Sequence, residues 1–480
     1  MAKKKKPSSA QASSSSETGG GPTKKPLLAF AGLGAVASVA AAVFLRRPAA
    51  FPLAAAGAAC PAALVEVSRD DVAAAAAAVD GRARLRCPFV VRGWVDEAAW
   101  LGEKAWERVR RAPRGRPIKY DALDGDGAHV FTYWDNNTLL ASAALERNVA
   151  RSHAVRVAPS GRALVNAVRA AGTRYGGTGH GVSPALGNDL SGARWTAAAA
   201  AFLAEAGATP RSPGLWAGAP SSRSFPHFDS FSNVYAVLAG AKTLDLAPPA
   251  EAPRFAIHPA THPRARQARV DAFSEVARGR LAGAHSVALG AGDAAFIPPG
   301  WLHRFTVTAG GPALAVSTTA LPPEFTHFDS WVRDRPRTAP FLRDTSRPWT
   351  HPRLVAVLGA FAPALAEALG ASRVLAEFLA AYGPETRAEL GMPPARSRFI
   401  PDCPPIDAAD AALAAASAAA VAAEFTAAYR PELVPLYLAP FLENVLSRVA
   451  AGARGAALWA DVLDFVDRCL VPGFEERAAG

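Results

Sequence analysis

The sequence is poor in cysteine and lacks the paired cysteines that typically bind structural zinc. Its four cysteines show no CxxC spacing, so we do not expect a structural zinc site. A disulfide between Cys403 and Cys469 would fit the C-terminal region, although no local pattern supports it. The cysteines therefore leave the redox compartment open.

Lysine is also scarce. The chain has nine lysines against 43 arginines, and six of the nine lie in the first 25 residues. Ala, Gly, Pro and Arg are used heavily, as a GC-rich coding sequence would produce. The later lysines, Lys104, Lys119 and Lys242, stand against this bias. We therefore treat each of them as a residue kept for its geometry or its compact charge.

Acidic residues are almost absent from the start of the chain. Residues 1–60 carry six Lys, Arg46 and Arg47 against the single acid Glu17, a balance of +7 out of the total of +11. The remaining residues are close to neutral at about +4, so no nucleic-acid partner is expected. The basic charge instead indicates the orientation of a membrane segment.

The N-terminal region predicts a membrane anchor. Residues 1–26 are rich in Lys, Ser and Gly and should be disordered. Residues 27–45 contain no charge, and a helix of this length spans roughly 28 Å, close to the thickness of a bilayer core. The positive charge before it predicts a single-pass type II protein with its body in the endoplasmic reticulum or Golgi lumen. A cleaved signal, an organelle-targeting leader and a buried Ala-rich helix remain alternatives.

Three further regions follow the predicted anchor. Residues 46–80 form a linker that ends in a short Ala-rich helix, residues 81–335 form a strand-rich domain, and residues 336–480 form a helical region. Acidic residues interrupt the Ala-rich stretches near the C-terminus. We therefore expect a bundle of soluble helices there and no further membrane span.

Within the middle region the predicted secondary structure changes along the chain. Residues 87–93 predict a strand and a turn, and residues 94–112 and 194–206 predict helices from the spacing of their apolar side chains. Short strands separated by Gly and Pro run from 215 to 321. This pattern is typical of a β-barrel or sandwich.

A His and an Asp lie two residues apart in a strand-like context at His227-Phe-Asp229. Side chains alternate faces along a strand, so both point the same way and can bind one metal ion. The chain has a second copy, His327-Phe-Asp329, which Arg, Pro and helical sequence follow. We interpret this second copy as a surface or helix-start segment.

A third candidate ligand follows a distinctive corner. The stretch from Gly292-Asp293 to Pro-Pro-Gly-Trp leads directly to His303. Two apolar strands follow it, separated by Gly310-Gly311, and they predict a hairpin that closes a barrel.

This ordered set resembles the jumonji C oxygenases over residues 80–335. In that family an HxD pair, a Lys thirteen residues beyond the Asp, and a His after a GD…PPGW stretch lie on a double-stranded β-helix of the cupin or jelly-roll type. Asp229 and Lys242 are thirteen residues apart here. The resemblance implies a mixed β/α fold with flanking helices, and Fe(II) bound by His227, Asp229 and His303.

The resemblance also implies a 2-oxoglutarate site. Lys242 would bind the distal carboxylate of this co-substrate, with Ser224 and Tyr175 as hydroxyl donors and Asn233 as a polar pocket residue. A Lys242 that reaches the surface or pairs with Asp245 is the alternative. Ser317, Thr318 and Thr319 stand where many relatives carry an amide.

Relatives with Asp at the metal are mostly hydroxylases of proteins or RNA, whereas lysine demethylases usually carry Glu. The resemblance therefore implies hydroxylation of a protein side chain, with succinate and CO2 as co-products. A cupin-type metal enzyme that does not use 2-oxoglutarate and a non-catalytic binding protein are the alternatives. The C-terminal helices would form either a homodimer interface or a lid over the barrel.

Overall fold

The computed structural model describes residues 60, 63–72, 86–112, 118–123, 130–131, 153–170, 173–177, 184–205, 207–258, 262, 264–274, 279–333, 338–381, 403–446, 461–462, 464–472 and 474. Residues 47–480 form one compact unit. The predicted tail at 1–26 and the predicted anchor at 27–45 lie outside the described residues, as does most of the predicted linker at 46–80.

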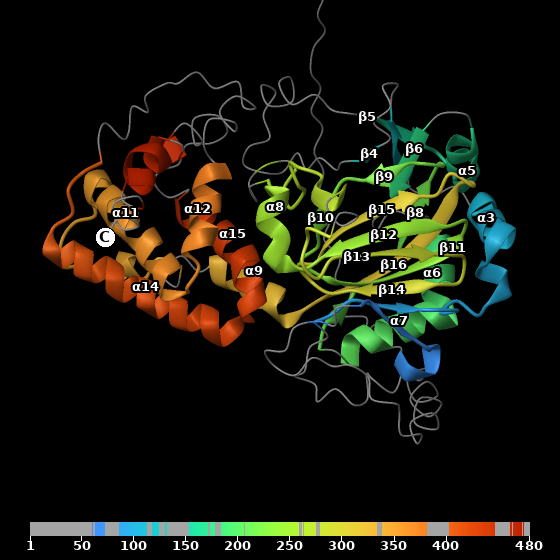
Figure 1. The fold of residues 1–480 in the computed structure, drawn as a ribbon, viewed down its shortest axis with the longest axis horizontal. Coiled ribbons are helices and arrows are strands. Elements are labelled where there is room, and N and C mark those ends of the chain that lie inside the picture. Colours follow the sequence, from blue (N-terminus) through green and yellow to red (C-terminus); the bar gives the residue numbers. More distant parts are fainter. Residues whose placement is uncertain are drawn as a thin grey trace, which may run out of the picture. The chain divides into compact units, whose positions relative to one another are not determined.

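The middle of the chain forms two β-sheets (Figure 1). The larger sheet contains, in spatial order, β1 (Val65–Val67), β2 (Phe89–Val91), β14 (Ala294–Ile297), β11 (Ser232–Ala239), β16 (Ala313–Leu321), β8 (Gly214–Gly218), β6 (Thr173–Gly177), β3 (Ile118–Leu123) and β5 (His153–Ala158), with β7 (Thr209–Pro210) beside β16. The smaller sheet contains β13 (His285–Leu289), β12 (Lys242–Ala247), β15 (Leu302–Val307), β9 (Arg223–Ser224) and β4 (Val130–Phe131), with β10 (His227–Phe228) beside β15.

The chain passes repeatedly from one sheet to the other. The strands β8, β11, β14 and β16 lie in the larger sheet, and the strands between them in sequence, β9, β10, β12, β13 and β15, lie in the smaller sheet. This alternation is the double-stranded β-helix that the sequence predicted, a mixed β/α fold. The predicted hairpin after His303 is wrong, because β15 pairs with β12 and β16 pairs with β11. The two strands belong to opposite sheets, and the Gly310-Gly311 segment connects the sheets.

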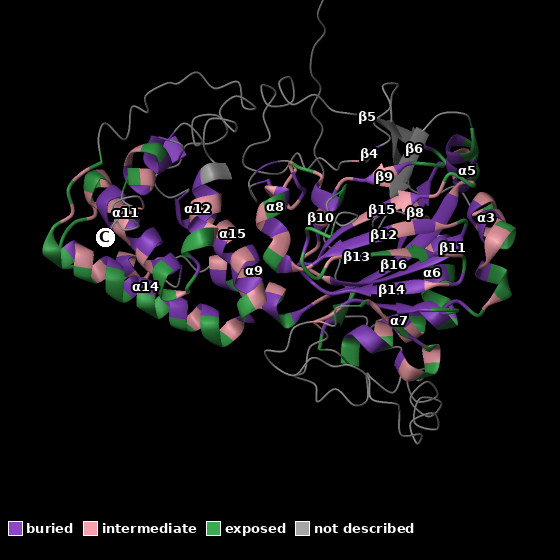
Figure 2. Cartoon of the chain, viewed as in Figure 1, coloured by how far each residue is buried: buried purple, intermediate pink, exposed green. Residues whose placement is uncertain are grey.

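The central strands of the larger sheet are buried on both faces, and β11, β14 and β16 are purple along nearly their whole length in Figure 2. On β11, Tyr235 and Val237 join the core between the sheets, while Val234 and Leu238 join the core on the other face. Four helices cover that outer face: α3 (Gly102–Arg111), α5 (Gly161–Arg169), α6 (Pro184–Gly192) and α7 (Arg194–Glu205). Burial on both faces explains why β11 reads as an almost unbroken apolar run.

Most of the local predictions in this region hold. The strand predicted within 87–93 is β2, followed by a turn, and the helix predicted over 194–206 is α7. The helix predicted over 94–112 is two elements, because η1 (Ala98–Trp100) ends at Leu101 before α3 begins. Leu101 has an extended backbone conformation, which separates the two helices.

The C-terminal region is helical, as predicted. Its elements are α9 (Pro323–Arg333), η4 (Pro340–Arg343), α11 (His351–Ala368), α12 (Ser372–Ala381), α14 (Ala408–Ala428), η5 (Pro431–Leu433), α15 (Val434–Leu446) and the π-helix η6 (Val466–Leu470). Two short elements, η2 (Pro249–Glu251) and α8 (Ala252–Phe255), follow β12, and α8 contributes Ala252 and Phe255 to the apolar core of these helices. Among the described residues, α14 alone is long and apolar enough to cross a membrane by length and composition.

The second HxD copy lies inside helix α9. The ring of His327 is hydrogen-bonded through Nδ1 to the hydroxyl of Tyr429 at 2.8 Å, and its Nε2 lies 3.5 Å from Glu424. Phe328 packs against Tyr437, with ring centroids 4.9 Å apart. These contacts join α9 to the following helices, which supports the structural interpretation of this copy.

A disulfide joins Cys60 to Cys87, with Cα atoms 5.5 Å apart. It ties the segment before β1 to the start of β2. Cys403 is exposed and Cys469 is buried, and both are free thiols. The structure therefore does not contain the Cys403–Cys469 disulfide considered from the sequence.

Candidate metal centre and its pocket

The structure brings His227, Asp229 and His303 together. His227 of β10 stands directly opposite His303 of β15 in antiparallel register, and their ring centroids are 4.3 Å apart. Asp229 follows β10 on the same face as His227, and its Oδ2 lies 3.7 Å from Nε2 of His303. One potential ligand atom from each side chain lies within 4.8 Å of the other two.

Backbone carbonyls orient both imidazole rings. Nδ1 of His227 lies 2.8 Å from the carbonyl oxygen of Phe225, and Nδ1 of His303 lies 3.0 Å from that of Trp301. A carbonyl oxygen only accepts, so each Nδ1 carries a proton and donates it. Each Nε2 is then the nitrogen without a proton, as a metal-binding imidazole requires.

The protein also keeps His227 uncharged near neutral pH. Burial lowers the pKa of His227 to about 4, and the neighbouring His303 adds to this effect. A neutral imidazole binds a metal without first releasing a proton. Two imidazoles and one carboxylate on one side of a site form the donor set that favours Fe(II) and leaves further coordination positions open. The three residues therefore fit a ferrous ion.

A pocket of about 250 Å³ opens beside the three ligands. It lies between the two sheets, and its lining follows the alternation of side chains along each strand. The lining residues are Phe131, Ser212, Gly214, Trp216, Ser224, His227, Asp229, Phe231, Asn233, Tyr235, Arg266, His303, Phe305, Ser317 and Thr319.

Lys242 lies behind one wall of this pocket. Its side chain is completely buried, and its Nζ donates a hydrogen bond to the hydroxyl of Tyr235 at 2.6 Å. The rings of Tyr235 and Phe305 are stacked with centroids 3.9 Å apart, and both line the pocket. Burial lowers the pKa of Lys242 to about 7.

Neither alternative interpretation of Lys242 agrees with the structure. A side chain with no exposed surface does not reach solvent. Asp245 is three residues further along β12, so it points to the opposite face. There it accepts hydrogen bonds from Arg304 at 2.8 Å and from Ser286 at 2.7 Å. The amine of Lys242 therefore lies on the pocket side of the sheet.

The other predicted co-substrate residues differ in how they are placed. Ser224 is buried at the pocket, and its hydroxyl accepts a hydrogen bond from the backbone of Phe305 at 3.0 Å. Asn233 lines the pocket, and its Oδ1 is buried without a hydrogen-bond partner in the described part of the chain. The backbone of Tyr175 lies in β6 opposite Gly218 of β8, while its side chain lies outside the described residues.

Several pocket residues, Tyr235, Trp216 and Arg266 among them, were not predicted as site residues from the sequence. Tyr235 lies two residues after Asn233 on β11, so the alternation of faces from that predicted pocket residue contained a usable signal. Trp216 lines the pocket and donates a hydrogen bond from its indole to Ser317 at 2.9 Å. Arg266 comes from a separate loop, where its Nη1 lies 3.7 Å from Oδ1 of Asp229. No spacing in the sequence relates Arg266 to the metal ligands.

A second hollow lies next to the metal pocket. This groove has a volume of about 530 Å³ and shares Phe231 and Arg266 with the pocket. One side consists of barrel residues, and the other consists of residues from α9, η5 and α15. The groove therefore lies between the barrel and the C-terminal helices.

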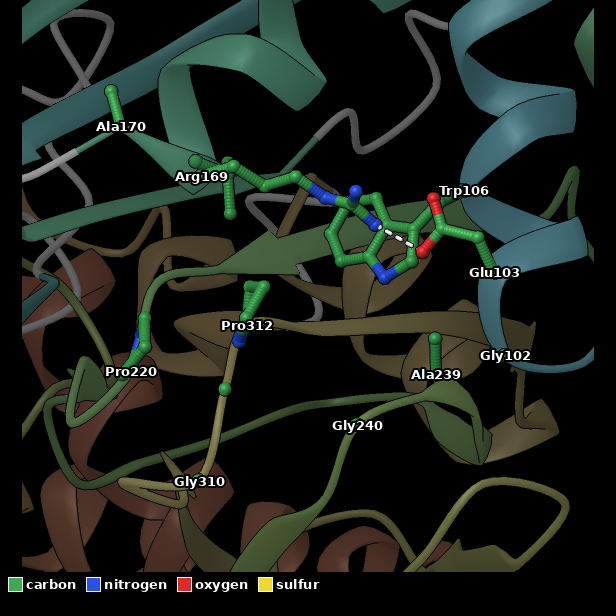
Figure 3. Close-up of a pocket in the computed structure, with 12 residues that line it drawn as sticks. Gly102, Glu103, Trp106, Arg169, Ala170, Pro220, Ala239, Gly240, Gly310 and Pro312 are labelled. Atoms are coloured by element: carbon green, nitrogen blue, oxygen red, sulfur yellow. Dashed lines mark hydrogen bonds and ion pairs between the residues drawn. The ribbon is translucent and has the colours of Figure 1, made fainter.

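A larger pocket of about 760 Å³ has a different character (Figure 3). Helices α3 and α5 contribute Trp106 and the ion pair between Glu103 and Arg169, whose atoms are 2.7 Å apart. Arg169 also lies over the ring of Trp106 at 5.1 Å. The lining residues include no His or Cys, so this pocket offers no comparable set of metal ligands.

Comparison with known proteins identifies the central domain. Residues 181–318, which include all three metal-ligand candidates, match the family model of the cupin-like domain. No curated protein matches the sequence. The X-ray structure of E. coli ycfD is similar at 12% identity and a TM-score of 0.31, over 55% of this chain and 56% of that chain. This chain thus spans about half the length of that structure, and a similarity of this size supports no statement about activity.

The chain therefore contains a cupin-like domain with a mixed β/α fold. A candidate metal site of the His-Asp-His type lies within it.

Proposed function

We propose that this cupin-like domain is an Fe(II)- and 2-oxoglutarate-dependent oxygenase that hydroxylates a protein side chain. The observation that carries the proposal is the presence of two features at one pocket. Three metal-ligand candidates line it, and a completely buried lysine of the same sheet lies behind Tyr235 and Phe305, which also line it. A metal site alone would not require that lysine.

In this proposal His227, Asp229 and His303 hold the ferrous ion. Iron held there would allow O2 to act as the oxidant. One oxygen atom would enter the co-substrate, which would leave as succinate and CO2, and the other would enter a C–H bond of the acceptor. The residues of the chain position the reactants. The carbonyls of Phe225 and Trp301 hold the imidazoles in the orientation in which Nε2 faces the site.

Lys242 would bind the distal carboxylate of 2-oxoglutarate. In the register between β12 and β15, Leu246 pairs with His303 and Lys242 pairs with Val307. The side chains of His303 and Lys242 therefore start four residues apart along the strand direction, roughly 13 Å. A five-carbon dicarboxylate held at the metal by its keto-acid end would extend toward Lys242 and Tyr235. Its charge would offset the desolvation of the amine.

Ser224, Asn233 and Tyr175 are proposed as further contacts of the co-substrate. The buried Oδ1 of Asn233 supports this assignment, because a polar group in the pocket could satisfy it. The Asn233→Ala substitution would remove both the buried oxygen that lacks a hydrogen-bond partner and its proposed contact with the co-substrate.

We also propose that the domain acts in the lumen of the endoplasmic reticulum or Golgi, attached to the membrane by residues 27–45. The Cys60–Cys87 disulfide supports an oxidising compartment, since stable disulfides are rare in the cytosol. Targeting to another organelle remains the alternative for the same N-terminal sequence.

The two HxD copies provide a matched test of the metal site. We expect the His227→Ala variant to lose bound Fe(II) or Mn(II) and all succinate production, because a ligand is removed. We expect His327→Ala to keep both, and to lose about 1 kcal/mol of stability with its hydrogen bond to Tyr429. Metal content by mass spectrometry and succinate release measure these outcomes, with circular dichroism as the control for folding.

A thermal-shift experiment separates the proposal from its rivals. In the presence of Mn(II), 2-oxoglutarate should raise the melting temperature, since it binds the folded state. No shift with 2-oxoglutarate, despite bound Mn(II), would favour a cupin-type enzyme that does not use this co-substrate. A protein that binds neither would instead be a non-catalytic binding module.

A further inference from the structure

We propose that the groove beside the metal pocket binds the acceptor polypeptide, and that it selects a segment with an apolar side chain next to an acidic one. This inference rests on the proposed function, because it names the substrate class of the same centre. It also assigns the C-terminal helices a role as one wall of the substrate site.

The position of the groove supports this assignment. Phe231 and Arg266 line both the groove and the metal pocket, so the two cavities are adjacent and a segment bound in the groove would lie next to the metal ligands. The groove volume of about 530 Å³ lies within the usual range for ligand sites. The pocket of about 250 Å³ is left for the co-substrate and the reacting side chain.

The lining of the groove is mainly apolar and aromatic. Phe325 and Phe328 of α9 form its helical side together with Leu436 and Tyr437 of α15. The ring of Phe328 packs against that of Tyr437. Phe231, Phe325 and Phe328 are only half-buried, so a ligand can cover more of their surface. Burying apolar surface contributes about 25 cal/mol per Å². This surface therefore favours an aromatic or large aliphatic side chain in the bound segment.

The charges that line the groove are all positive. Its fifteen lining residues include two arginines, Arg211 and Arg266, and no acidic residue. Arg211 is exposed and has no ion-pair partner within the described part of the chain. Arg266 lies next to Asp229, whose charge a bound divalent metal would offset. Arginine forms strong paired hydrogen bonds with carboxylates, so the groove favours an acidic segment.

The wall formed by the C-terminal helices is fixed against the barrel. Gly300 belongs to the Pro-Pro-Gly-Trp corner and lines the groove together with Leu433 and Leu436. A Cβ atom at position 300 would lie 2.3 Å from Cδ1 of Leu436 and 3.1 Å from Cδ2 of Leu433. The side chains of Leu433 and Leu436 therefore occupy the space beside the corner that a Cβ atom would need. This contact supports the role of these helices as a wall of the groove.

Labelled peptides test the proposed selectivity on the full-length chain purified in mild detergent. The first peptide, a Gly-Ser decapeptide, carries one phenylalanine followed by two aspartates. The second replaces both aspartates by lysines, and the third replaces the phenylalanine by serine. By fluorescence anisotropy with Mn(II) present, we expect the first peptide to bind at least tenfold more tightly than either of the others. Added salt should weaken this binding.

Two pairs of variants locate the binding surface. Arg211→Glu should abolish the preference for aspartate over lysine, whereas Arg162→Glu, an equal change of charge on an exposed part of α5, should leave it unchanged. Leu321→Trp should weaken binding of the first peptide at least tenfold by filling the groove. Val270→Trp, at a valine that is 52% exposed outside the groove, should not. Circular dichroism and Mn(II) binding report on folding in all four variants.

Equal binding of the three peptides would overturn the proposal, as would a preference for aspartate that persists in Arg211→Glu. Failure of the oxygenase proposal looks different. A chain that prefers the first peptide, and loses that preference in Arg211→Glu, but gains no stability from 2-oxoglutarate would retain the groove assignment and refute the oxygenase.

Discussion

At the scale of single residues, the site depends on groups whose charge the protein controls by burial. His227 is kept neutral because its pKa is lowered to about 4. Lys242 has a pKa near 7 for the same reason, and its amine donates to Tyr235. The first shift suits a metal ligand. The second leaves a cation that gains stability when an anion comes near.

The Lys242→Met variant tests the role of this amine. We expect 2-oxoglutarate to bind at least tenfold more weakly, because one charge-assisted hydrogen bond is lost. We expect the protein without co-substrate to become more stable by about 2 kcal/mol, since methionine needs no hydration at a buried site. Mn(II) binding should not change. Calorimetric titration and urea unfolding measure these effects, and Lys104→Met, at an exposed lysine of α3, is the control.

Lys242 also predicts how stability and binding depend on pH. The pKa of Lys242 is about 7 in the folded chain, where the amine is buried, and 10.5 when the amine is exposed. Between pH 7 and 10.5 the unfolded chain therefore binds more protons than the folded chain. The contribution of this group to stability therefore rises from pH 7 to about 10 and is flat below pH 7. Binding of 2-oxoglutarate should weaken above pH 7, because the amine must then take up a proton. A flat affinity between pH 6 and 9 would argue against contact with Lys242.

At the scale of secondary-structure elements, two short strands and one corner determine the geometry. β10 contributes only His227 and Phe228, and its pairing with β15 places the two imidazoles opposite each other. The corner before β15 is held from two directions. The indole of Trp301 donates to the carbonyl of Arg86 at 2.9 Å, and Gly300 contacts α15.

The Gly300→Ala variant tests the contact between this corner and α15. Gly300 has φ of +82°, and a Cβ there would collide with Leu436. We expect a loss of about 2–4 kcal/mol, from the left-handed conformation and from overpacking. Gly93→Ala is the matched control, because Gly93 has φ of +64° with no atom within 4 Å of a Cβ. It should lose only about 1–2 kcal/mol.

The double variant Gly300→Ala with Leu436→Ala separates the two causes. If the collision contributes, urea unfolding should give a smaller loss for the pair than for the sum of the single variants. Strict additivity would mean that α15 does not press on the corner.

At the scale of the whole molecule, the segment before β1 and the C-terminal helices both pack against the cupin-like domain. The Cys60–Cys87 disulfide fastens the chain ahead of β1, and Cys60 packs against the core between the sheets. On the other side, the core of the C-terminal helices continues into Phe228 and Leu302, which neighbour the metal ligands. Stability and the shape of the site are therefore coupled over most of the described chain.

Removing the disulfide with Cys60→Ser and Cys87→Ser should cost about 3–4 kcal/mol, because it closes a loop with a sequence separation of 27. Cys403→Ser, at an exposed free thiol, should change stability by less than about 0.5 kcal/mol. Maleimide labelling of unfolded, unreduced protein should find two thiols. Four reactive thiols would show that the disulfide does not form.

The sequence by itself indicated a cupin-type fold and three metal-ligand candidates. Alternation along a strand placed His227 and Asp229 on one face, and the corner before His303 marked the third ligand candidate. These features are local, so they can be read from spacing.

Only the tertiary structure decided which distant residues share the site. The register of β12 against its neighbours placed Lys242 behind Tyr235, and a separate loop brought Arg266 to Asp229. The pairing of Cys60 with Cys87 and the groove under α15 also depend on packing between distant segments. The physical reason is that such contacts follow from how sheets and helices pack, and a spacing along the chain does not record that packing.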